Sequence, residues 1–349
     1  MTDMSDMNGM NEEDGAVRTL TKKDFTSDQE VRWCPGCGDY AILSAVQGFL
    51  PEMGIEPHKM VFVSGIGCSG RFSYYVDTYG FHGIHGRAPA IATGIATANP
   101  DLVVWVITGD GDGLSIGGNH LIHALRRNVN LTILLFNNQI YGLTKGQYSP
   151  TSEEGKVTKS TPFGSVDHPF DPIALALGAE GSFVARTIDN DRQHLTEVLR
   201  QATAHRGTSF VEIYQNCNVF NDGAFDLLRE KPQGVHNQIR LQHGEPILFD
   251  GDNRCVAVGE NGRLVVANVD EVSPDAIVVH DKAGRPSLAF ALAHLSHGPT
   301  TPTCIGVFRE IERPVYGDAM NEQVESATER LGRGDLSTLL TSGDTWTVG

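Results

Sequence analysis

Residues 102–138 read LVVWVITGDGDGLSIGGNHLIHALRRNVNLTILLFNN. The stretch holds two apolar, β-branched runs, Leu102 to Thr108 and Leu131 to Phe136, which are typical of buried strands. Between them, Gly117 to Arg127 has the pattern of a helix. Because strand–helix–strand units make neighbouring parallel strands, we predict an α/β fold with a mostly parallel sheet and helices on both faces.

A polar motif follows each of these predicted strands. Gly109-Asp110-Gly111 comes directly after the first strand and Asn137-Asn138 directly after the second, with the 25 residues 112–136 between the motifs. Parallel strands end on one edge of a sheet, where open α/β folds bind ligands. A carboxylate and an amide oxygen there, beside glycines that let backbone N–H groups approach a phosphate, can hold Mg²⁺ and a diphosphate together. Gly-Asp-Gly alone is also an ordinary turn, so the interpretation depends on the pair of motifs.

The composition sets the broad class. The chain has 349 residues with 40% hydrophobic content, enough for a large core in one or two domains. The net charge of −16 argues against nucleic acid and anionic membranes as partners. No apolar run approaches the roughly 18 residues that span a bilayer. Met1 to Ala16 has no features of a secretion signal, so we expect a disordered tail over residues 1–22 and a cytoplasmic protein.

Four of the six cysteines lie in motifs or directly after predicted strands. They are Cys34 and Cys37 in Trp-Cys-Pro-Gly-Cys-Gly, Cys68 after the run Met60 to Ser64, and Cys217 after the run Ser209 to Gln215. Cys255 and Cys304 have no such setting and are expected to be small buried hydrophobic residues.

Four interpretations compete for the Cys34–Cys37 pair. They are a thioredoxin-type redox pair, a structural zinc site, two unremarkable thiols, and part of an iron–sulfur cluster. A cluster needs four thiolates that converge in space rather than in sequence. Because Cys68 and Cys217 both follow strands, both can reach the edge that carries Asp110 and Asn138, which favours a cluster close to the diphosphate site.

The motifs together resemble one family closely. Gly-Asp-Gly followed at this distance by Asn-Asn resembles the thiamine-diphosphate motif. The whole order resembles the β subunit of a 2-oxoacid:ferredoxin oxidoreductase, most like the 2-oxoglutarate type, densely over about residues 30–230 and loosely to about 310. The motifs that carry the resemblance are Trp33 to Gly38, Gly65 to Arg71, His85 to Ala88, Gly109 to Asp112, Ile116 to His120 and Asn137 to Thr144.

The resemblance implies a ligand set for each cofactor. It assigns a 4Fe–4S cluster to Cys34, Cys37, Cys68 and Cys217. It assigns Mg²⁺ to Asp110, Asn138 and the carbonyl of Ile140. It places around thiamine diphosphate Ile66, Gly67, Cys68, Ser69, His85, Gly111, Asp112, Gly142 and Leu143. Two simpler interpretations stay open: His85, like His82, is a hydrogen-bonded loop histidine, and Asp112 caps the following helix.

The resemblance also implies an activity and partners. The enzyme would oxidatively decarboxylate a 2-oxoacid with coenzyme A and pass electrons to ferredoxin. Thiamine enzymes use a glutamate against the cofactor, and no residue of this chain can be assigned to that role, so an α subunit is expected to supply it. Gly65 to Gly70 also matches the G-x-G-x-x-G dinucleotide pattern, which we discount because Cys68 belongs to the predicted cluster and no downstream helix with an acidic partner is evident.

Two cationic residues are candidates for binding the distal carboxylate of the substrate. Arg71 follows Cys68 by three residues, and a guanidinium there can bind the distal carboxylate of 2-oxoglutarate. Lys145 is a second candidate. The simpler interpretation is that Arg71 touches only phosphates or a structural carboxylate. Two rival functions also remain: a non-redox thiamine-diphosphate decarboxylase or synthase with structural zinc, and an assembly subunit with a vestigial thiamine site.

The rest of the chain divides at about residue 230. We expect a thiamine-diphosphate-binding domain over residues 23–230 and a C-terminal region over 231–349 that contacts another subunit. Helices are predicted over residues 39–49, 172–179 and 191–205, with a long polar loop over 141–169 that acts as a lid or subunit contact. Short apolar runs at 264–266, 276–279 and 304–308 are expected to form edge strands or an arm on a partner chain.

Overall fold

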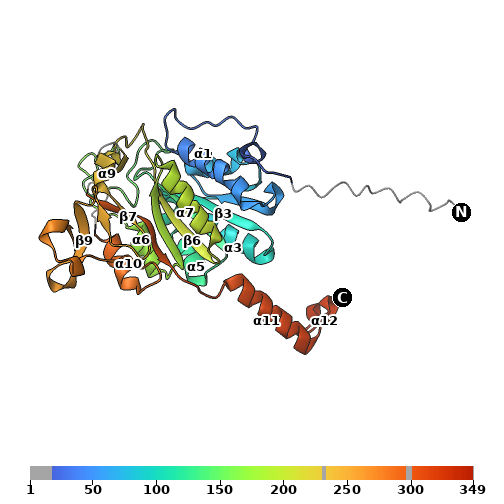
Figure 1. The fold of residues 1–349 in the computed structure, drawn as a ribbon. Coiled ribbons are helices and arrows are strands. Elements are labelled where there is room, and N and C mark those ends of the chain that lie inside the picture. Colours follow the sequence, from blue (N-terminus) through green and yellow to red (C-terminus); the bar gives the residue numbers. More distant parts are fainter. Residues whose placement is uncertain (1–17, 230–232, 296–300, 349) are drawn as a thin grey trace.

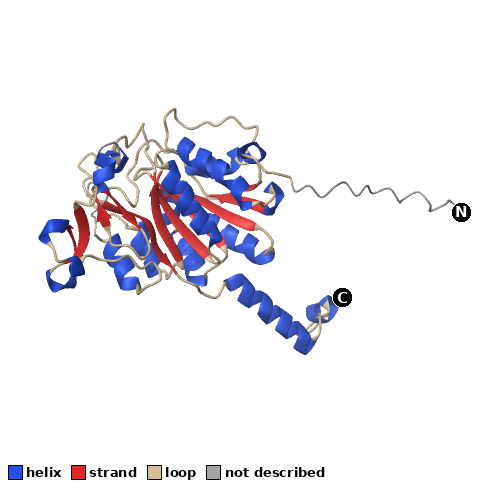
Figure 2. Cartoon of the chain, in the orientation of Figure 1, coloured by secondary structure: helices blue, strands red, loops and turns tan. Residues whose placement is uncertain are grey.

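The computed structural model describes residues 18–229, 233–295 and 301–348. Within these residues the centre is an eight-stranded sheet in the order β2-β1-β3-β4-β6-β5-β11-β7, accompanied by a three-stranded antiparallel sheet in the order β10-β9-β8 (Figures 1 and 2). The strands are β1 (Met60–Ser64), β2 (Tyr79–His82), β3 (Val103–Gly109), β4 (Leu131–Asn137), β5 (Phe183–Ile188), β6 (Thr208–Tyr214), β7 (Gln238–Leu241), β8 (Leu248–Phe249), β9 (Arg254–Val258), β10 (Leu264–Asn268) and β11 (Thr303–Glu310).

The helices connect and cover these strands. They are α1 (Asp39–Phe49), α2 (Phe72–Tyr75), α3 (Ala88–Ala98), α4 (Asp110–Leu114), α5 (Gly118–Arg127), α6 (Pro172–Gly178), α7 (Arg192–Ala204), α8 (Asp226–Arg229), α9 (Gln233–Asn237), α10 (Pro286–Ala293), α11 (Tyr316–Leu331) and α12 (Leu336–Leu340). Short 3-10 turns occur at Lys22–Phe25, Leu50–Met53, Pro57–Lys59, Ser69–Arg71, Glu260–Gly262, Val269–Glu271 and Pro274–Ala276.

The sheet separates two hydrophobic cores. Helices α1 and α7 pack together on one face, and α3, α5, α6 and α10 cover the other. The strands serve both cores because alternate side chains point to opposite faces: in β1, Phe62 belongs to the core under α1 and Val63 to the other. Since the central strands are covered on both sides, β4 and β6 are buried along their whole length, and most of their residues are apolar.

The register of the central strands positions the polar motifs. Strands β3, β4 and β6 run parallel, with Gly109 opposite Phe136 and Asn137 opposite Tyr214. The residues that follow, Asp110, Asn138 and Gln215, therefore leave the sheet at the same edge.

The structure confirms the predicted fold class and most predicted elements. The helices expected at 39–49, 172–179 and 191–205 appear as α1, α6 and α7, with ends that shift by at most a residue. The helix expected at 117–127 appears as α5, preceded by the extra turn α4. In the long stretch 141–169 the structure has turns and one isolated bridge, between Tyr141 and Gln147, but no helix or strand.

Two predictions for the C-terminal region are wrong. The run at 304–308 is not an edge strand or an arm, because β11 lies inside the main sheet between β5 and β7. The run at 276–279 forms no strand and makes only isolated bridges, such as that between Ala257 and Ile277. The run at 264–266 is part of β10, which does form an edge of the small sheet.

The predictions for the two ends of the chain compare differently with the structure. Most of the predicted disordered tail lies outside the described residues, and Lys22 already belongs to a 3-10 turn. At the other end, α11 and α12 extend away from the sheet as an arm that contains no buried residue (Figure 1). The subunit contact expected of the C-terminal region stays a prediction. Among the described helices, none combines the length and apolarity needed to cross a bilayer.

The aromatic packing on β1 gives a test of the core. Phe62 is fully buried and stacks on Trp105 with ring centroids 5.4 Å apart. We expect Phe62→Ala to lower the free energy of unfolding by about 3–5 kcal/mol, because the variant loses apolar contacts and leaves a cavity. Phe163 is fully exposed, so Phe163→Ala should change stability by less than about 0.5 kcal/mol. Equilibrium denaturant unfolding measures the free energy of unfolding of both variants. Equal decreases in the two variants would contradict this account of the core.

Candidate functional site

A cavity of about 590 Å³, partly open to solvent, lies at the edge where the parallel strands end. Its walls come from the turns after β1, β3 and β4 and from the loop before α3. Every residue predicted to contact thiamine diphosphate lines it: Ile66, Gly67, Cys68, Ser69, His85, Gly111, Asp112, Gly142 and Leu143. The three predicted Mg²⁺ ligands, Asp110, Asn138 and Ile140, line it as well. The structure therefore brings these residues to one site, and their roles as ligands stay predictions.

The carboxylate of Asp110 is buried and held from the loop that follows β4. Its Oδ2 accepts hydrogen bonds from Ser149 Oγ at 2.5 Å and Thr151 Oγ1 at 2.6 Å. Burial raises the pKa of Asp110, and the two hydroxyl donors offset part of that shift. Because both hydroxyl bonds end on Oδ2, neither occupies Oδ1, which suits a carboxylate that also binds a cation.

The structure separates the roles of the two neighbouring asparagines. Asn138 lines the cavity, and its Oδ1 accepts only the local N–H of Ile140, at 3.2 Å. Asn137 instead lies behind the site, where its Nδ2 donates to Glu212 Oε1 at 2.7 Å. Of the two, Asn138 is therefore the one that lines the cavity.

Asp112 fixes the loop that carries His85. Its Oδ1 accepts from Gly86 N at 2.7 Å and lies 3.1 Å from His85 Nδ1, and its Oδ2 accepts from Thr108 Oγ1 at 2.6 Å. The carboxylate thus does more than cap a helix, which was the simpler interpretation of Asp112. Both strand β3 and the loop before α3 depend on this one side chain.

Close packing explains a glycine of the first motif. A Cβ at Gly111 would lie 2.2 Å from a ring carbon of Tyr141, and the Tyr141 hydroxyl donates to the Gly111 carbonyl at 3.0 Å. Only a residue without a side chain fits under that ring. The cavity wall after β4 therefore lies directly on the Gly-Asp-Gly turn.

The predicted cluster cysteines converge beside this cavity. The Sγ atoms of Cys217 and Cys68 lie 3.5 and 3.6 Å from the point that a Cβ on Gly142 would occupy. Cys37 lies close enough to both for their charges to contribute to its raised pKa. Cys255 and Cys304 lie elsewhere and are fully buried, as predicted, with Cys304 inside the hydrophobic core.

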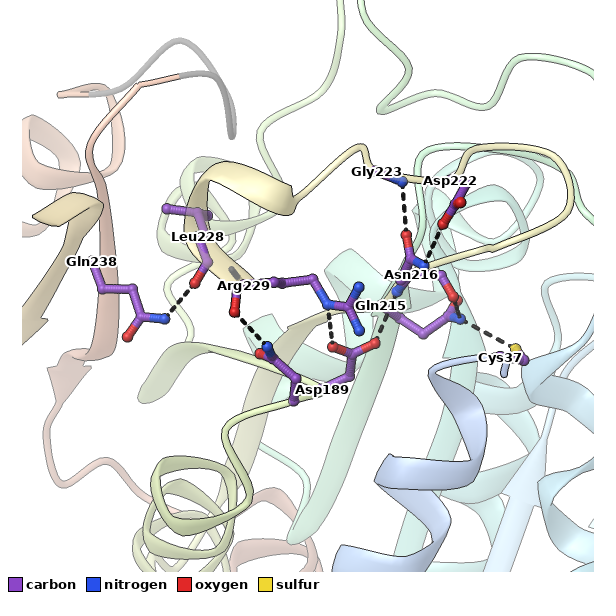
Figure 3. Close-up of polar contacts among 10 residues, drawn as sticks. Cys37, Asp189, Gln215, Asn216, Asp222, Gly223, Leu228, Arg229 and Gln238 are labelled. Atoms are coloured by element: carbon purple, nitrogen blue, oxygen red, sulfur yellow. Dashed lines mark hydrogen bonds and ion pairs between the residues drawn. The ribbon is translucent and has the colours of Figure 1, made fainter. Parts of the chain in front are cut away.

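Hydrogen bonds between three loops hold the cysteines in place. Trp33 Nε1 donates to the Cys68 carbonyl at 2.7 Å, Gly38 N donates to the Asn216 carbonyl at 3.1 Å, and Asn218 Nδ2 donates to the Pro35 carbonyl at 2.6 Å. Behind the loop that carries Cys217, the Asp189 carboxylate accepts hydrogen bonds from Asn216 N and Arg229 Nε, each at 2.9 Å (Figure 3). The Cys34–Cys37 turn, the Cys68 turn and the Cys217 turn therefore form one connected unit.

Without a bound metal, the surroundings of Cys37 and Cys68 favour the neutral thiol over the thiolate. Burial, and next the neighbouring carboxylate of Asp39, raise the pKa of Cys37 and raise that of Cys68 to about 12. Asp39 lines the cavity, and its carboxylate is buried. Burial, with a further contribution from Asp189, raises its pKa to about 7. Binding of a metal to these thiols would therefore displace protons.

Four thiols are the donors that a 4Fe–4S cluster requires. In the described residues, no three His, Cys, Asp or Glu side chains converge as ligands of one metal ion. In a 4Fe–4S cluster each thiolate binds a different iron, so the four sulfurs surround a larger body than one ion. Three half-buried thiols and one exposed thiol, two of them beside Gly142, are compatible with that requirement.

The two candidate substrate residues are not among those that line the cavity. Arg71 Nη1 donates to the carbonyl of Arg32 at 2.7 Å, so its guanidinium is engaged elsewhere in the isolated chain. Lys145 follows Thr144, which does line the cavity. The nearby Gly65 to Gly70 turn leads only into the four-residue helix α2, which agrees with discounting it as a dinucleotide fingerprint.

Sequence reasoning missed several residues of the site. Asp39, Tyr141 and Thr144 line the cavity, and Ser149 and Thr151 bind Asp110 from a loop that has no periodic pattern. For Ser149 and Thr151, the only available signal was a cluster of hydroxyl residues in an otherwise unstructured stretch.

Comparisons with known proteins agree with this geometry. Residues 58–213 match the family described as thiamine pyrophosphate enzyme, C-terminal TPP binding domain. The 2-oxoglutarate oxidoreductase subunit KorB of Mycobacterium tuberculosis is 60% identical over 329 residues, which cover 93% of this chain and 88% of that one. The 2-oxoacid:ferredoxin oxidoreductase subunit beta of Saccharolobus solfataricus is 47% identical over 192 residues, 54% of this chain and 63% of that one.

A solved structure extends the likeness to the whole fold. It is the 2-oxoglutarate:ferredoxin oxidoreductase from Magnetococcus marinus with 2-oxoglutarate, coenzyme A and succinyl-CoA bound, which matches with a TM-score of 0.73 and 31% identity over 96% of this chain and 100% of that one. With the mycobacterial relative aligned over most of both chains, these matches show that this chain belongs to the family of 2-oxoacid oxidoreductase β subunits and has their thiamine-diphosphate-binding fold.

Proposed function

We propose that this chain is the β subunit of a 2-oxoglutarate oxidoreductase. The enzyme decarboxylates 2-oxoglutarate oxidatively, forms succinyl-CoA and CO₂, and passes electrons through a 4Fe–4S cluster to ferredoxin in the cytoplasm. The observation that carries the proposal is the shared cavity, in which Cys68 lines the same wall as the Gly-Asp-Gly and Asn-Asn motifs. The names of the relatives, which specify 2-oxoglutarate and ferredoxin, support the substrate and the electron acceptor.

In this proposal the cavity holds thiamine diphosphate through Mg²⁺. Asp110, Asn138 and the Ile140 carbonyl bind the ion, and the glycines of the first motif let backbone groups approach the diphosphate. Thiamine diphosphate supplies the carbanion chemistry that removes CO₂ from a 2-oxoacid. The chain's own residues orient it: Asp112 holds the His85 loop, and Ile66 packs at the cavity wall.

The proposed cluster is bound by Cys34, Cys37, Cys68 and Cys217. Because Cys68 also lines the cavity, electrons would travel a short distance from the thiamine site to the cluster. A cluster accepts electrons one at a time, which matches a one-electron acceptor such as ferredoxin.

The chain acts together with an α subunit. Leu143 lines the cavity and is exposed, and so are Ile84, which precedes the cavity residue His85, and Ile116, which lies beside Gly86. Exposed apolar groups that gather beside a site mark a contact with another protein. The α subunit would cover this rim and supply the glutamate that this chain lacks, and the region 231–349 would add further contacts.

The first test concerns the cluster ligands. We expect Cys217→Ala, expressed with the α subunit, to lower iron content and abolish electron transfer to ferredoxin, because the cluster loses one of four thiolates. Cys255→Ala is the matched control, since Cys255 is buried far from the predicted cluster. Iron analysis and the broad absorption near 400 nm report the result. A colourless wild type that contains zinc would contradict the proposal, and full iron in Cys217→Ala would remove Cys217 from the ligand set.

The second test concerns the metal site. Removing one partner of a buried charge contact costs about 2–5 kcal/mol, so Asp110→Ala should weaken thiamine diphosphate binding by about 30-fold or more. The cluster should still assemble, because Asp110 contacts none of the cysteines. Calorimetry with Mg²⁺ and thiamine diphosphate measures the affinity, with the exposed Asp101→Ala as control. Unchanged affinity would place the metal elsewhere.

The third test concerns the substrate. If Arg71 turns from the Arg32 carbonyl to bind the distal carboxylate, Arg71→Met should lower kcat/KM for 2-oxoglutarate by roughly 30- to 1,000-fold, with little effect on pyruvate. Lys145→Met should show this pattern instead if Lys145 is the binding residue. Steady-state rates with both substrates decide between them. Equal losses for the two substrates would exclude a role in reading the carboxylate.

A further inference from the structure

We propose that Gln215 is a positioning residue that bridges the two cofactor sites. One end of its side-chain amide orients Asn138 toward the metal, and the other donates a hydrogen bond to the sulfur of Cys37. The inference rests on the proposed function, because it needs both a cluster on Cys37 and Mg²⁺ at Asn138.

Gln215 is the first residue after β6 and is fully buried. Its Nε2 donates to Cys37 Sγ at 3.3 Å and to the Asn216 carbonyl at 2.6 Å, and its Oε1 accepts from Asn138 Nδ2 at 2.9 Å (Figure 3 shows the first of these contacts). Its backbone N–H donates to the Asn137 carbonyl at 2.9 Å, which fixes the main chain beside the end of β4.

These partners allow only one orientation of the amide. The two acceptors, a sulfur and a carbonyl oxygen, lie on the Nε2 side, and the donor Asn138 Nδ2 lies on the Oε1 side. A flipped amide would place oxygen against both acceptors and nitrogen against a donor. The N–H group directed at Cys37 is therefore determined by the network.

The same network fixes the oxygen of Asn138. Its Nδ2 is committed to Gln215 and its Oδ1 faces Ile140 N, so flipping Asn138 would break both bonds. The amide of this cavity-lining residue is thus held in one orientation in the absence of a metal. Partners that orient metal ligands in this way typically contribute about 10- to 100-fold in metal affinity.

At the other end, the N–H donor acts on the electrostatics of a cluster. Hydrogen bonds to cluster sulfurs are one of the factors that set reduction potential. Reduction adds a negative charge, so a donor at Cys37 stabilises the reduced state more than the oxidised state and raises the potential. Gln215 therefore tunes electron acceptance by the cluster with the same side chain that holds the metal ligand.

The experiment uses the complete enzyme with its α subunit and three variants. Gln215→Leu removes both ends of the bridge. Gln215→Glu keeps an oxygen that accepts from Asn138 but removes the N–H donor to Cys37. Gln47→Leu is the matched control. Gln47 is also buried and lies on α1, the helix that follows the Cys34–Cys37 turn, and its Nε2 donates to the Tyr75 carbonyl.

Two quantities are measured: the cluster midpoint potential, by redox titration followed by electron paramagnetic resonance, and the affinity for Mg²⁺–thiamine diphosphate, by calorimetry. In Gln215→Leu we expect the reduction equilibrium constant to fall by up to tenfold, which corresponds to about 59 mV for one electron, and the affinity to fall by about 10-fold or more. Gln215→Glu should lower the potential, because its second oxygen replaces the donor that faces the Cys37 sulfur and the Asn216 carbonyl, and it should keep more of the affinity than Gln215→Leu. Gln47→Leu should change neither.

The possible outcomes separate this proposal from the function on which it rests. A wild-type enzyme that contains no iron, or that binds no thiamine diphosphate, would contradict the proposed function itself. A wild type with both cofactors, together with a Gln215→Leu enzyme that keeps its potential or its affinity, overturns the bridge alone. If Gln215→Leu does not assemble, Gln215→Glu decides, since a wild-type potential in that variant contradicts the N–H···S contact.

Discussion

The parallel register of β3, β4 and β6 is the constraint on which the site depends. Gly109 pairs with Phe136 and Asn137 with Tyr214, so each strand releases its next residue at the same edge. Any slip by one residue would also exchange the two buried faces of a strand, because neighbouring side chains point to opposite sides. The two cores beneath α1 and α3 therefore fix the register, and the register in turn fixes the meeting of Asp110, Asn138 and Gln215.

Burial of this edge from water demands that its polar groups be paired. Behind the cavity, the fully buried Glu212 accepts from Asn137 Nδ2 and from Arg186 Nε, the latter at 2.6 Å. Burial raises the pKa of Glu212, and the Arg186 charge opposes that shift. Removal of one partner from such a pair is costly because the other charge is left buried and alone. This ion pair thus links β5 to β6, and through Asn137 to the end of β4. On the cavity side, Ser149 and Thr151 donate hydrogen bonds to Asp110.

The sequence was sufficient for the fold class, the central strands and the motifs, because those features have local signals: apolar runs, glycine turns and strand ends. It could not place β11 inside the sheet, since an internal antiparallel strand and an edge strand have the same short apolar pattern. It could not choose between Asn137 and Asn138 by geometry, which depends on the direction of each side chain. Nor could it find Gln215, Ser149 or Thr151, whose importance comes from partners 39 or more residues away.

The chain divides its chemistry unevenly with its partner. It lines the proposed diphosphate and metal end of the cavity with glycines, carboxylates and amides that are fixed by hydrogen bonds, and it places three thiol-bearing loops beside that wall. The rim, by contrast, is apolar and exposed at Ile84, Ile116 and Leu143, and the nearby cation Arg71 is bound to a carbonyl of its own chain. Rigid groups suit cofactors that remain bound, whereas a substrate must enter and leave. In the proposed function, binding of the 2-oxoacid would therefore fall to the face between the two subunits, where docking of the α subunit would set the direction of Arg71 or Lys145.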